Sequence, residues 1–465
     1  ALVALRCAAG GNGLVGSGAS SQMLTDCYWS SAVSGSNFSV SDDVTGSGDI
    51  DSLGFKVVKV GETKTISASD LSAIWGKANV TVKGNYGKSG NGISLDAGSA
   101  SARVTGVTAN TSNKLEYTAE IELPSSVGAG SVTVSQYFNL PILVVSASTE
   151  GDGSESNPLG ITNAAEFNLL RYADGIYAKL NKDITFEAAA FAFDGYLNGN
   201  GHTVNVKAPV FTELFGTLEN VNFVAKANIS SAVLGRAIGA KVMDVTVSLA
   251  DGAKFNASGA NSGVMFSTVS GKSVLDGCRV KANVIISGET TNFGSLAGAI
   301  NGKGTKVIDS GAYSNITASA KATNAAIAVG SVTASDVSFT NCYVSGKNNA
   351  GKFSFVASIT AKDTSFTNIY TSKGAQSGAD FANYKFIDKS QFSEWQFDCG
   401  DIAFFTGNGG KFVAEIPPVG AMEASSAADY TVSCDSSKLA ASLSVQNGKL
   451  VLSVSRTAGV VTVKG

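Results

Sequence analysis

Histidine, proline and charge are all scarce in this sequence. Of its 465 residues one is histidine, six are proline and 15% are charged, with a formal net charge of -3. One histidine provides no His cluster for zinc, and the six cysteines include no pair with CxxC spacing. The charge is low and slightly acidic, and no basic cluster occurs, which argues against a nucleic-acid-binding protein.

Long apolar runs are scarce as well, and no intact leader is expected. No apolar run is long enough to span a membrane. The chain begins Ala1-Leu2-Val3, without Met or a charged n-region, so we do not expect an intact signal peptide at its start. We expect a mature or cut piece of a longer protein. Low charge with abundant Ser, Thr, Asn and Gly is common in secreted or surface-displayed proteins, and we expect an extracellular, cell-surface location.

A repeat occupies the stretch from Phe193 to Gly378. Each copy has a short apolar strand, a Gly/Ser step, a turn rich in Lys, Asn and Gly, and a second short strand. The first-strand anchors end at Leu218, Ile238, Val269, Ile300, Val332 and Ile359. The second-strand anchors are Asn220-Val221, Asp244-Val245, Gly277-Cys278, Gly311-Ala312, Asn341-Cys342 and Asn368-Ile369. The variation in period falls in Gly/Ser/Asn-rich connections, where insertions cost little.

This period, with short strands and no helical pattern between them, predicts a parallel β-solenoid. Each coil buries its apolar face only when the next coil stacks on it. The rival interpretation is a β-sandwich with evenly spaced strands. We favour the solenoid because the same residue class recurs at the same place in each coil. Cys278 and Cys342 share one coil position with Val221, so we interpret them as small buried apolar residues; a disulfide between them is the less favoured alternative.

Two further regions flank this repeat. Residues 1–45 are predicted to be the terminal coils of a preceding β-helix, because Leu24–Trp29 matches Phe339–Val344 position by position. Residues 46–147 have alternating strands with turn residues between them, which predicts an immunoglobulin-like β-sandwich. The expected strands are Phe55–Val60, Ala78–Val82, Ala102–Val104, Leu115–Leu123 and Ser131–Val134.

The third and fourth regions are residues 148–412, a capped parallel β-helix, and 413–465, an Ig-like sandwich that we expect to be incomplete. Asn163 with Glu166 forms a capping-box pattern, and Gly175 is expected to end the helix that follows. This helix would shield one open end of the solenoid. An aromatic cluster is predicted to close the far end, and it contains Phe392, Trp395, Phe397, Phe404 and Phe405.

Several motifs of this region carry a family resemblance. In order they are Gly151-Asp152-Gly153, Asn157–Ile161, Tyr177–Ile184, Phe193-Asp194-Gly195 and Gly199–Val204. The stretch resembles the β-helix domains of large bacterial cell-surface adhesins with GLUG-type repeats, of the Bacteroidetes type. The resemblance implies a right-handed, pectate-lyase-like parallel β-helix, and it does not imply lyase activity. The expected fold is therefore all-β, with β-helices alternating with Ig-like sandwiches.

Residues that could carry chemistry are few. His202 could act as a general base, but a turn residue entering a coil is the favoured interpretation, with no Ser or Cys nucleophile arrangement in view. Paired carboxylates could cleave sugars, yet the acidic residues mostly sit at turns before strands, where Asp caps backbone N–H groups. The candidates are Asp194, Asp244, Asp276, Asp309 and Asp336. We expect no enzymatic activity.

Two weaker site hypotheses remain. Asp152, Glu155, Asp42 and Asp43 could bind calcium, although no complete ligand series appears and solvated loop charges are favoured. No other cofactor is expected. Tyr313, Tyr343 and Tyr370 occur at related coil positions and could form a surface stripe that stacks on sugars, the alternative being an ordinary aromatic ladder.

These features favour a non-enzymatic structural or adhesive segment of a large extracellular surface protein or filament. The expected partners are surface glycans or other copies or segments of the same large protein, with no nucleic acid and no membrane-spanning segment. The alternatives are a polysaccharide lyase or hydrolase built on a β-helix, and a receptor-binding fibre like a phage tail spike, which would be an intertwined trimer.

Overall fold

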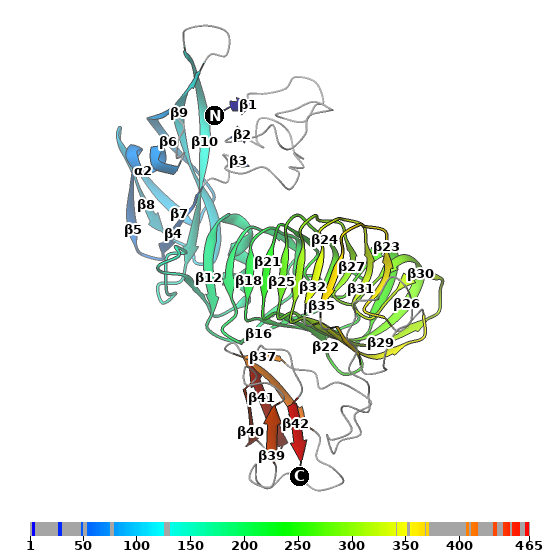
Figure 1. Cartoon of the computed structure of the whole chain (residues 1–465). Helices are drawn as coiled ribbons and strands as arrows, with labels where there is room; N and C mark the ends of the chain where they lie inside the picture. Colours follow the sequence, from blue (N-terminus) through cyan, green and yellow to red (C-terminus); the bar gives the residue numbers. More distant parts are fainter. Residues whose placement is uncertain are drawn as a thin grey trace. The chain divides into compact units, whose positions relative to one another are not determined.

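The computed structural model describes residues 2–4, 27–29, 48–49, 54–74, 79–124, 131–340, 342–350, 354–367, 369–371, 406–408, 411–416, 431–434, 440–446, 449–455 and 461–464. The chain divides into two compact units, Ala1–Lys179 and Leu180–Gly465. The described residues are mostly in β-strands (Figure 1), as the composition predicts. No helix among them has the length and apolar character that crossing a membrane requires.

Two antiparallel-rich sheets in the first unit share one hydrophobic core. One sheet has the order β4-β10-β9-β6 and the other β5-β8-β7. Their bounds are β4 (Lys56–Lys59), β5 (Thr63–Ser67), β6 (Asn79–Ser89), β7 (Ile93–Ala97), β8 (Ser101–Gly106), β9 (Thr111–Pro124) and β10 (Ser131–Val145). Buried residues of both sheets, such as Ile66, Val104 and Phe138, pack together with Leu71 of helix α2 (Ala68–Ile74).

The five strands expected between residues 46 and 147 all occur, and β5, β7 and α2 were missed. The missed strands alternate weakly: Thr63–Ser67 buries only Ile66, and Ile93–Ala97 buries only Ile93. Strands of this kind show little of the alternation on which strand prediction depends.

The first unit also contains the parallel strands β1 (Leu2–Ala4), β2 (Cys27–Trp29) and β3 (Gly48–Asp49). The β-helix origin of residues 1–45 stays a prediction. Later in the unit come β11 (Leu159–Ile161), helix α3 (Ala164–Asn168) and the 3₁₀ helix η2 (Leu169–Tyr172), and β12 (Ile176–Leu180) spans the boundary to the second unit.

The predicted cap of the α3 helix is present in modified form. Asn163 Oδ1 accepts the N–H groups of Ala165 and Glu166, each at 3.0 Å. The Glu166 carboxylate is buried and reaches back to Thr162 N at 2.7 Å, one residue before the expected capping-box partner. The helical segment ends at Tyr172, earlier than predicted, and Gly175 follows with a φ of 71°.

Residues 180–371 of the second unit form three parallel sheets, here called the stack. The first sheet contains β15 (Gly195–Asn198), β18 (Thr217–Glu219), β21 (Lys241–Met243), β25 (Val274–Asp276), β28 (Lys306–Ile308), β32 (Ser338–Thr340) and β35 (Ser365–Thr367). The second contains β13 (Ile184–Phe186), β16 (Thr203–Val206), β19 (Asn222–Ala225), β22 (Thr246–Leu249), β26 (Arg279–Phe293), β29 (Gly311–Ala318), β33 (Tyr343–Asn348) and β36 (Tyr370–Thr371). The third contains β14 (Phe191–Phe193), β17 (Phe211–Leu214), β20 (Arg236–Ile238), β24 (Phe266–Ser270), β27 (Ala297–Ile300), β31 (Val329–Val332) and β34 (Val356–Ile359).

The chain visits the three sheets in turn, so each circuit adds one strand to each sheet (Figure 1). All of these pairings are parallel, which contradicts the rival sandwich of antiparallel strands for this region. Side chains of one class lie above one another in columns. The inward column of the first sheet is buried throughout and comprises Leu197, Leu218, Val242, Leu275, Val307, Phe339 and Phe366.

The register corrects part of the predicted repeat. Val269, Ile300, Val332 and Ile359 do share one column, as expected. Leu218, however, belongs to the first sheet, while Val269 pairs with Ala237 rather than Ile238. The fourth turn anchor is also displaced: Arg279 pairs with Gly311, so Asp309-Ser310 matches Gly277-Cys278 and the predicted Gly311-Ala312 is two residues late. The small residues Ser310, Gly311 and Ala312 offered two similar alignments.

The middle circuits are wider than the first ones. Strand β26 continues beyond its pairing with β22 and β29 to Phe293, and this extension pairs with β23 (Phe255–Ser262) on one side and β30 (Ala322–Ala325) on the other. Amide side chains follow this extension, with Asn292 Nδ2 donating to Asn261 Oδ1 and Asn324 Nδ2 to Asn292 Oδ1, each at 2.8 Å. The longer repeat spacing in the middle of the sequence therefore reflects added strand, in addition to longer loops.

The last part of the chain has two small antiparallel sheets. One has the order β37-β38-β41-β40 and the other pairs β39 with β42. Their bounds are β37 (Thr406–Asn408), β38 (Lys411–Ile416), β39 (Thr431–Cys434), β40 (Ala441–Gln446), β41 (Lys449–Ser455) and β42 (Val461–Lys464). The predicted aromatic cluster at residues 392–405 lies outside the described residues.

Candidate functional site

The corner between the first and second sheets carries a column of turn residues in the left-handed conformation. Asn220, Asp244, Gly277 and Asp309 follow one another here, with φ of 49°, 52°, 69° and 47°. Each turn N–H bonds to the next circuit; Asp244 N, for example, donates to Asp276 O at 2.8 Å. Asn, Asp and Gly tolerate this conformation better than other residues, which explains their recurrence in the sequence.

Arg279 is buried beside this corner. It is 4% exposed, and its Nη1 donates to the carbonyl oxygens of Cys278, at 3.0 Å, and Asp309. Its guanidinium carbon lies 5.2 Å from the centroid of the Tyr343 ring, within cation–π range. One side chain thus links three successive circuits. Sequence reasoning missed it; the available signal was an arginine at an outward strand position surrounded by small residues.

The Tyr343 ring covers Gly311, where a Cβ atom would clash with the ring. Its hydroxyl is buried and has no hydrogen-bond partner among the described residues, and burial raises the pKa of Tyr343. This tyrosine therefore serves packing against Arg279 and Gly311.

The three predicted stripe tyrosines fall into two columns. Tyr343 and Tyr370 are register partners, whereas Tyr313 pairs with Lys281 and Ser345 two residues further along the strands. Tyr313 is half-buried on the outer face of the second sheet. A ligand role for the three residues stays a prediction, and the arrangement is that of a pair and a separate ring.

The candidate carboxylates gather only in part. Asp244 and Asp309 hold turn positions of the Arg279 corner, and Asp276 ends strand β25 one residue before the turn residue Gly277. Asp194 lies between β14 and β15, and Asp336 pairs with Lys303, with 3.6 Å between Oδ2 and Nζ. The positive φ of Asp244, Asp309 and Asp336 supports the interpretation that these residues shape turns.

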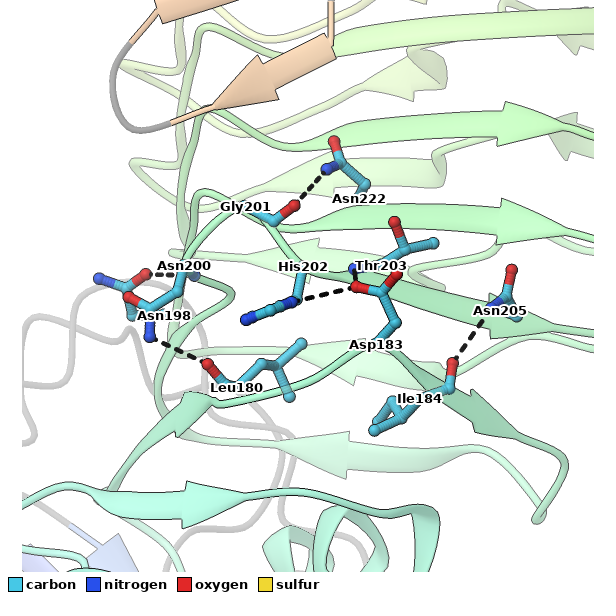
Figure 2. A network of polar contacts seen from close by, with 10 residues as sticks. All are labelled: Leu180, Asp183, Ile184, Asn198, Asn200, Gly201, His202, Thr203, Asn205 and Asn222. Atoms are coloured by element: carbon cyan, nitrogen blue, oxygen red, sulfur yellow. Dashed lines mark hydrogen bonds and ion pairs between the residues drawn. The ribbon is translucent and has the colours of Figure 1, made fainter. Parts of the chain in front are cut away.

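His202 belongs to a separate polar network at the entry to β16, shown in Figure 2. Its Nδ1 lies 3.1 Å from Asp183 Oδ1, which also accepts the Thr203 N–H at 2.9 Å. In the neutral imidazole with the proton on Nδ1, this contact is a hydrogen bond to the carboxylate. The pair holds the turn to the circuit before it.

Asparagine amides complete this network. Asn200, with a φ of 49°, donates through Nδ2 to Leu180 O at 2.9 Å, and Asn222 Nδ2 donates to Gly201 O at 3.0 Å. The residues drawn around His202 are Asn, Asp, Thr, Gly and aliphatic residues. Their polar contacts join one circuit to the next, apart from the bond from Asn200 N to Asn198 Oδ1, which lies within one turn. This geometry favours the turn role that we predicted for His202.

The calcium hypothesis concerns four residues. Asp152 Oδ1 accepts the Ser154 N–H at 3.0 Å, and hydrogen bonding from Ser154, its hydroxyl first, lowers the pKa of Asp152. Glu155 is exposed, and Asp42 and Asp43 lie outside the described residues. Among the residues that the structure describes, no three His, Cys, Asp or Glu side chains are placed to hold a metal ion.

The two thiols in the stack are free and fully buried. Ser310 occupies the intervening circuit, and its Oγ accepts the Cys278 N–H at 2.9 Å. Burial raises the pKa of both Cys278 and Cys342 to about 12. They are therefore small core residues, as predicted, and the alternative of a disulfide between them is wrong.

Comparisons with family models, with curated proteins and with solved structures find no match to this chain. Its function therefore has to be inferred from the geometry.

Proposed function

We propose that this chain is a non-enzymatic structural and adhesive segment of a large extracellular surface protein, acting as a stiff spacer that also presents a binding surface. The observation that carries the proposal is the continuous parallel register of the stack. Its first sheet keeps one inward column from Leu197 to Phe366 without interruption. A column of this kind resists bending because every circuit bonds to the next along its three strands.

The finer fold belongs to the same proposal. We interpret the stack as a right-handed, pectate-lyase-like β-helix, and the sheets around residues 56–145 and 406–464 as Ig-like sandwiches. The first strand of the N-terminal sheets, β4, lies parallel to the last, β10, while the other pairs are antiparallel. The resemblance to GLUG-type adhesin repeats supports the surface location.

The stiffness can be measured by pulsed electron paramagnetic resonance on the full chain. Spin labels at Thr217→Cys and Ser365→Cys share one outward column and are separated by five strand spacings, roughly 24 Å between backbones. The four cysteines outside the stack are replaced by serine. We expect one narrow distance distribution that does not broaden below the unfolding transition. A broad or multiple distribution would contradict a stiff spacer.

The non-enzymatic part needs its own test. The full chain is incubated with acidic and neutral glycans, and new reducing or unsaturated ends are quantified. We expect none above a heat-denatured control. Cleavage that is lost in Asp183→Asn or Asp276→Asn would overturn the proposal in favour of a polysaccharide lyase or hydrolase.

A further inference from the structure

The outer face of the second sheet is basic, although the whole chain is slightly acidic. Strands β16, β19, β22, β29 and β33 contain no Asp or Glu, and β26 has none before Glu289. The same strands carry two exposed lysines, Lys281 and Lys347, besides the buried Arg279. Strands β16, β22 and β29 lie along one side of the stack (Figure 1). A face with cations and no acidic residue attracts anions.

An aromatic ring lies between the two exposed lysines of this face. Tyr313 is the register partner of Lys281 on β26, and Lys347 pairs with Asn315 on the other side of β29. Burial alternates along β26 and β29, so Lys281 and Asn283 are exposed and Tyr313 and Asn315 half-buried on the outer face. The strands of the two lysines are two spacings apart, roughly 10 Å.

Amide groups adjoin the ring. Asn315 Nδ2 donates to Asn283 Oδ1 at 3.3 Å, which orders both side chains on the outer face. An Asn pair joined through one N–H and one oxygen retains further donor and acceptor capacity. The face thus combines a partly exposed ring, two ammonium groups and two ordered amides over three adjacent strands.

We infer that this outer face of β26, β29 and β33 binds a carboxylate-bearing saccharide. The inference rests on the proposed adhesive function and names its ligand class. The Tyr313 ring stacks on the apolar face of a sugar ring, the amides of Asn283 and Asn315 bond its hydroxyl groups, and Lys281 and Lys347 pair with carboxylates on successive units. A neutral glycan has no carboxylate to pair with the two lysines, and a simple polyanion has no sugar face to stack on the Tyr313 ring.

Neighbouring columns delimit the site. Tyr343 is turned to Arg279 and Gly311, as described above, so its ring is occupied within the protein. The first sheet supplies a matched surface, because Lys241 and Lys306 are exposed on strands two spacings apart and pair with Val274 between them. On that face the two lysines are also two strands apart, in one register column, and no tyrosine or Asn pair lies between them.

The test is calorimetric titration of the full chain with alginate oligosaccharides, and with dextran oligosaccharides of equal length as the neutral control. We expect alginate to bind at least about tenfold more tightly than dextran. Tyr313→Ala and Lys281→Ala/Lys347→Ala should each weaken alginate binding about tenfold, while Tyr313→Phe keeps binding within about threefold. Lys241→Ala/Lys306→Ala should leave it unchanged, and all variants should keep the wild-type unfolding midpoint.

Three results would overturn the inference: no binding of alginate, alginate binding that survives Tyr313→Ala, or dextran sulfate binding that depends on the lysines and not on the ring. None of these results bears on the stiff-spacer proposal, which is tested separately by the distance between labels at Thr217 and Ser365. A broad distance distribution, conversely, would defeat the spacer while alginate binding could still be measured.

Discussion

The two best-described regions of this chain are both β-rich, yet they are held together differently. In residues 56–145, β9 and β10 are joined directly in sequence and pair antiparallel, and the core collects residues from both sheets and a helix. In the stack, each pairing joins strands that lie one circuit apart and runs parallel. The first region has a single shared core, whereas in the second region the same strand pairing recurs in every circuit.

This difference predicts how damage spreads. A core defect between two sheets is confined to the module that contains it. A defect in the stack acts on the circuits on both sides, because no circuit buries its inward face without its neighbours. The predictions below use this contrast, beginning with the largest effect.

Truncating a stacked phenylalanine should have the largest effect. Phe339 is fully buried, with its ring 5.0 Å from and nearly parallel to Phe366 and edge-on to Phe355 at 5.3 Å. We expect Phe339→Ala to cost the stack about 3–5 kcal/mol and to raise hydrogen exchange in the circuits on both sides. The matched variant is Phe138→Ala, which removes a fully buried ring 6.0 Å from Tyr117.

Phe138→Ala should raise hydrogen exchange only within residues 56–145, at a similar cost. Hydrogen exchange followed by mass spectrometry, with urea unfolding, checks both variants. Equal spreading in the two regions, or confinement of the Phe339→Ala effect to its own circuit, would remove the contrast.

Arg279→Met should follow in size. The variant loses two charge-assisted hydrogen bonds to carbonyl oxygens and the cation–π contact with the Tyr343 ring. We expect a loss of about 2–4 kcal/mol of unfolding free energy. Arg279→Lys should restore less than half, because an ammonium lacks the planar fork that bonds two carbonyls while facing a ring. Full rescue by lysine would show that only the charge matters.

The buried thiols should make the stack sensitive to alkali. Their pKa is raised to about 12 in the folded state, so the unfolded thiols, with pKa near 9, release protons first as pH rises. The thiol contribution is complete below pH 9 and is lost between pH 9 and 12, by up to about 1.4 kcal/mol per pH unit for each thiol. Cys278→Val/Cys342→Val should flatten this slope in urea titrations, and an unchanged slope would assign it to other groups.

The smallest effect concerns a turn. Asp309 has a φ of 47°, and Gly277 holds the equivalent position one circuit earlier. Asp309→Ala places a Cβ in the left-handed region with no carboxylate to compensate, whereas Asp309→Gly relieves the strain. We expect the glycine variant to be about 1 kcal/mol more stable than the alanine variant in thermal unfolding. The opposite order would mean that the backbone conformation at this turn is not strained.

Much of the stack could be predicted because residues that fill one column have the same chemical character, so the sequence repeats. Val269, Ile300, Val332 and Ile359 are alike in sequence because they fill one column. The register failed at Gly311, where small residues satisfy two alignments equally and the Tyr343 ring selects one. The selecting contact lies 32 residues away along the chain, beyond the reach of a local pattern.

The candidate site was less accessible to sequence reasoning. Three tyrosines at similar repeat positions predicted one stripe, but Tyr313 lies two residues along the strand from the column of Tyr343. Arg279 was missed because its role depends on the carbonyl of Asp309 and the ring of Tyr343, which only the folded register brings together. Such contacts depend on which residues share a column.

The register itself is the central claim, and cross-linking tests it most directly. Lys306 and Ser338 are outward register partners on adjacent parallel strands, about 4.8 Å apart, within disulfide reach. Lys306→Cys/Ser338→Cys should therefore oxidise to a disulfide that mass spectrometry of its peptides detects. Lys306→Cys/Thr340→Cys, offset by two residues to roughly 8 Å, should stay reduced. Efficient bridging of the offset pair, with none in the aligned pair, would contradict the stacked circuits.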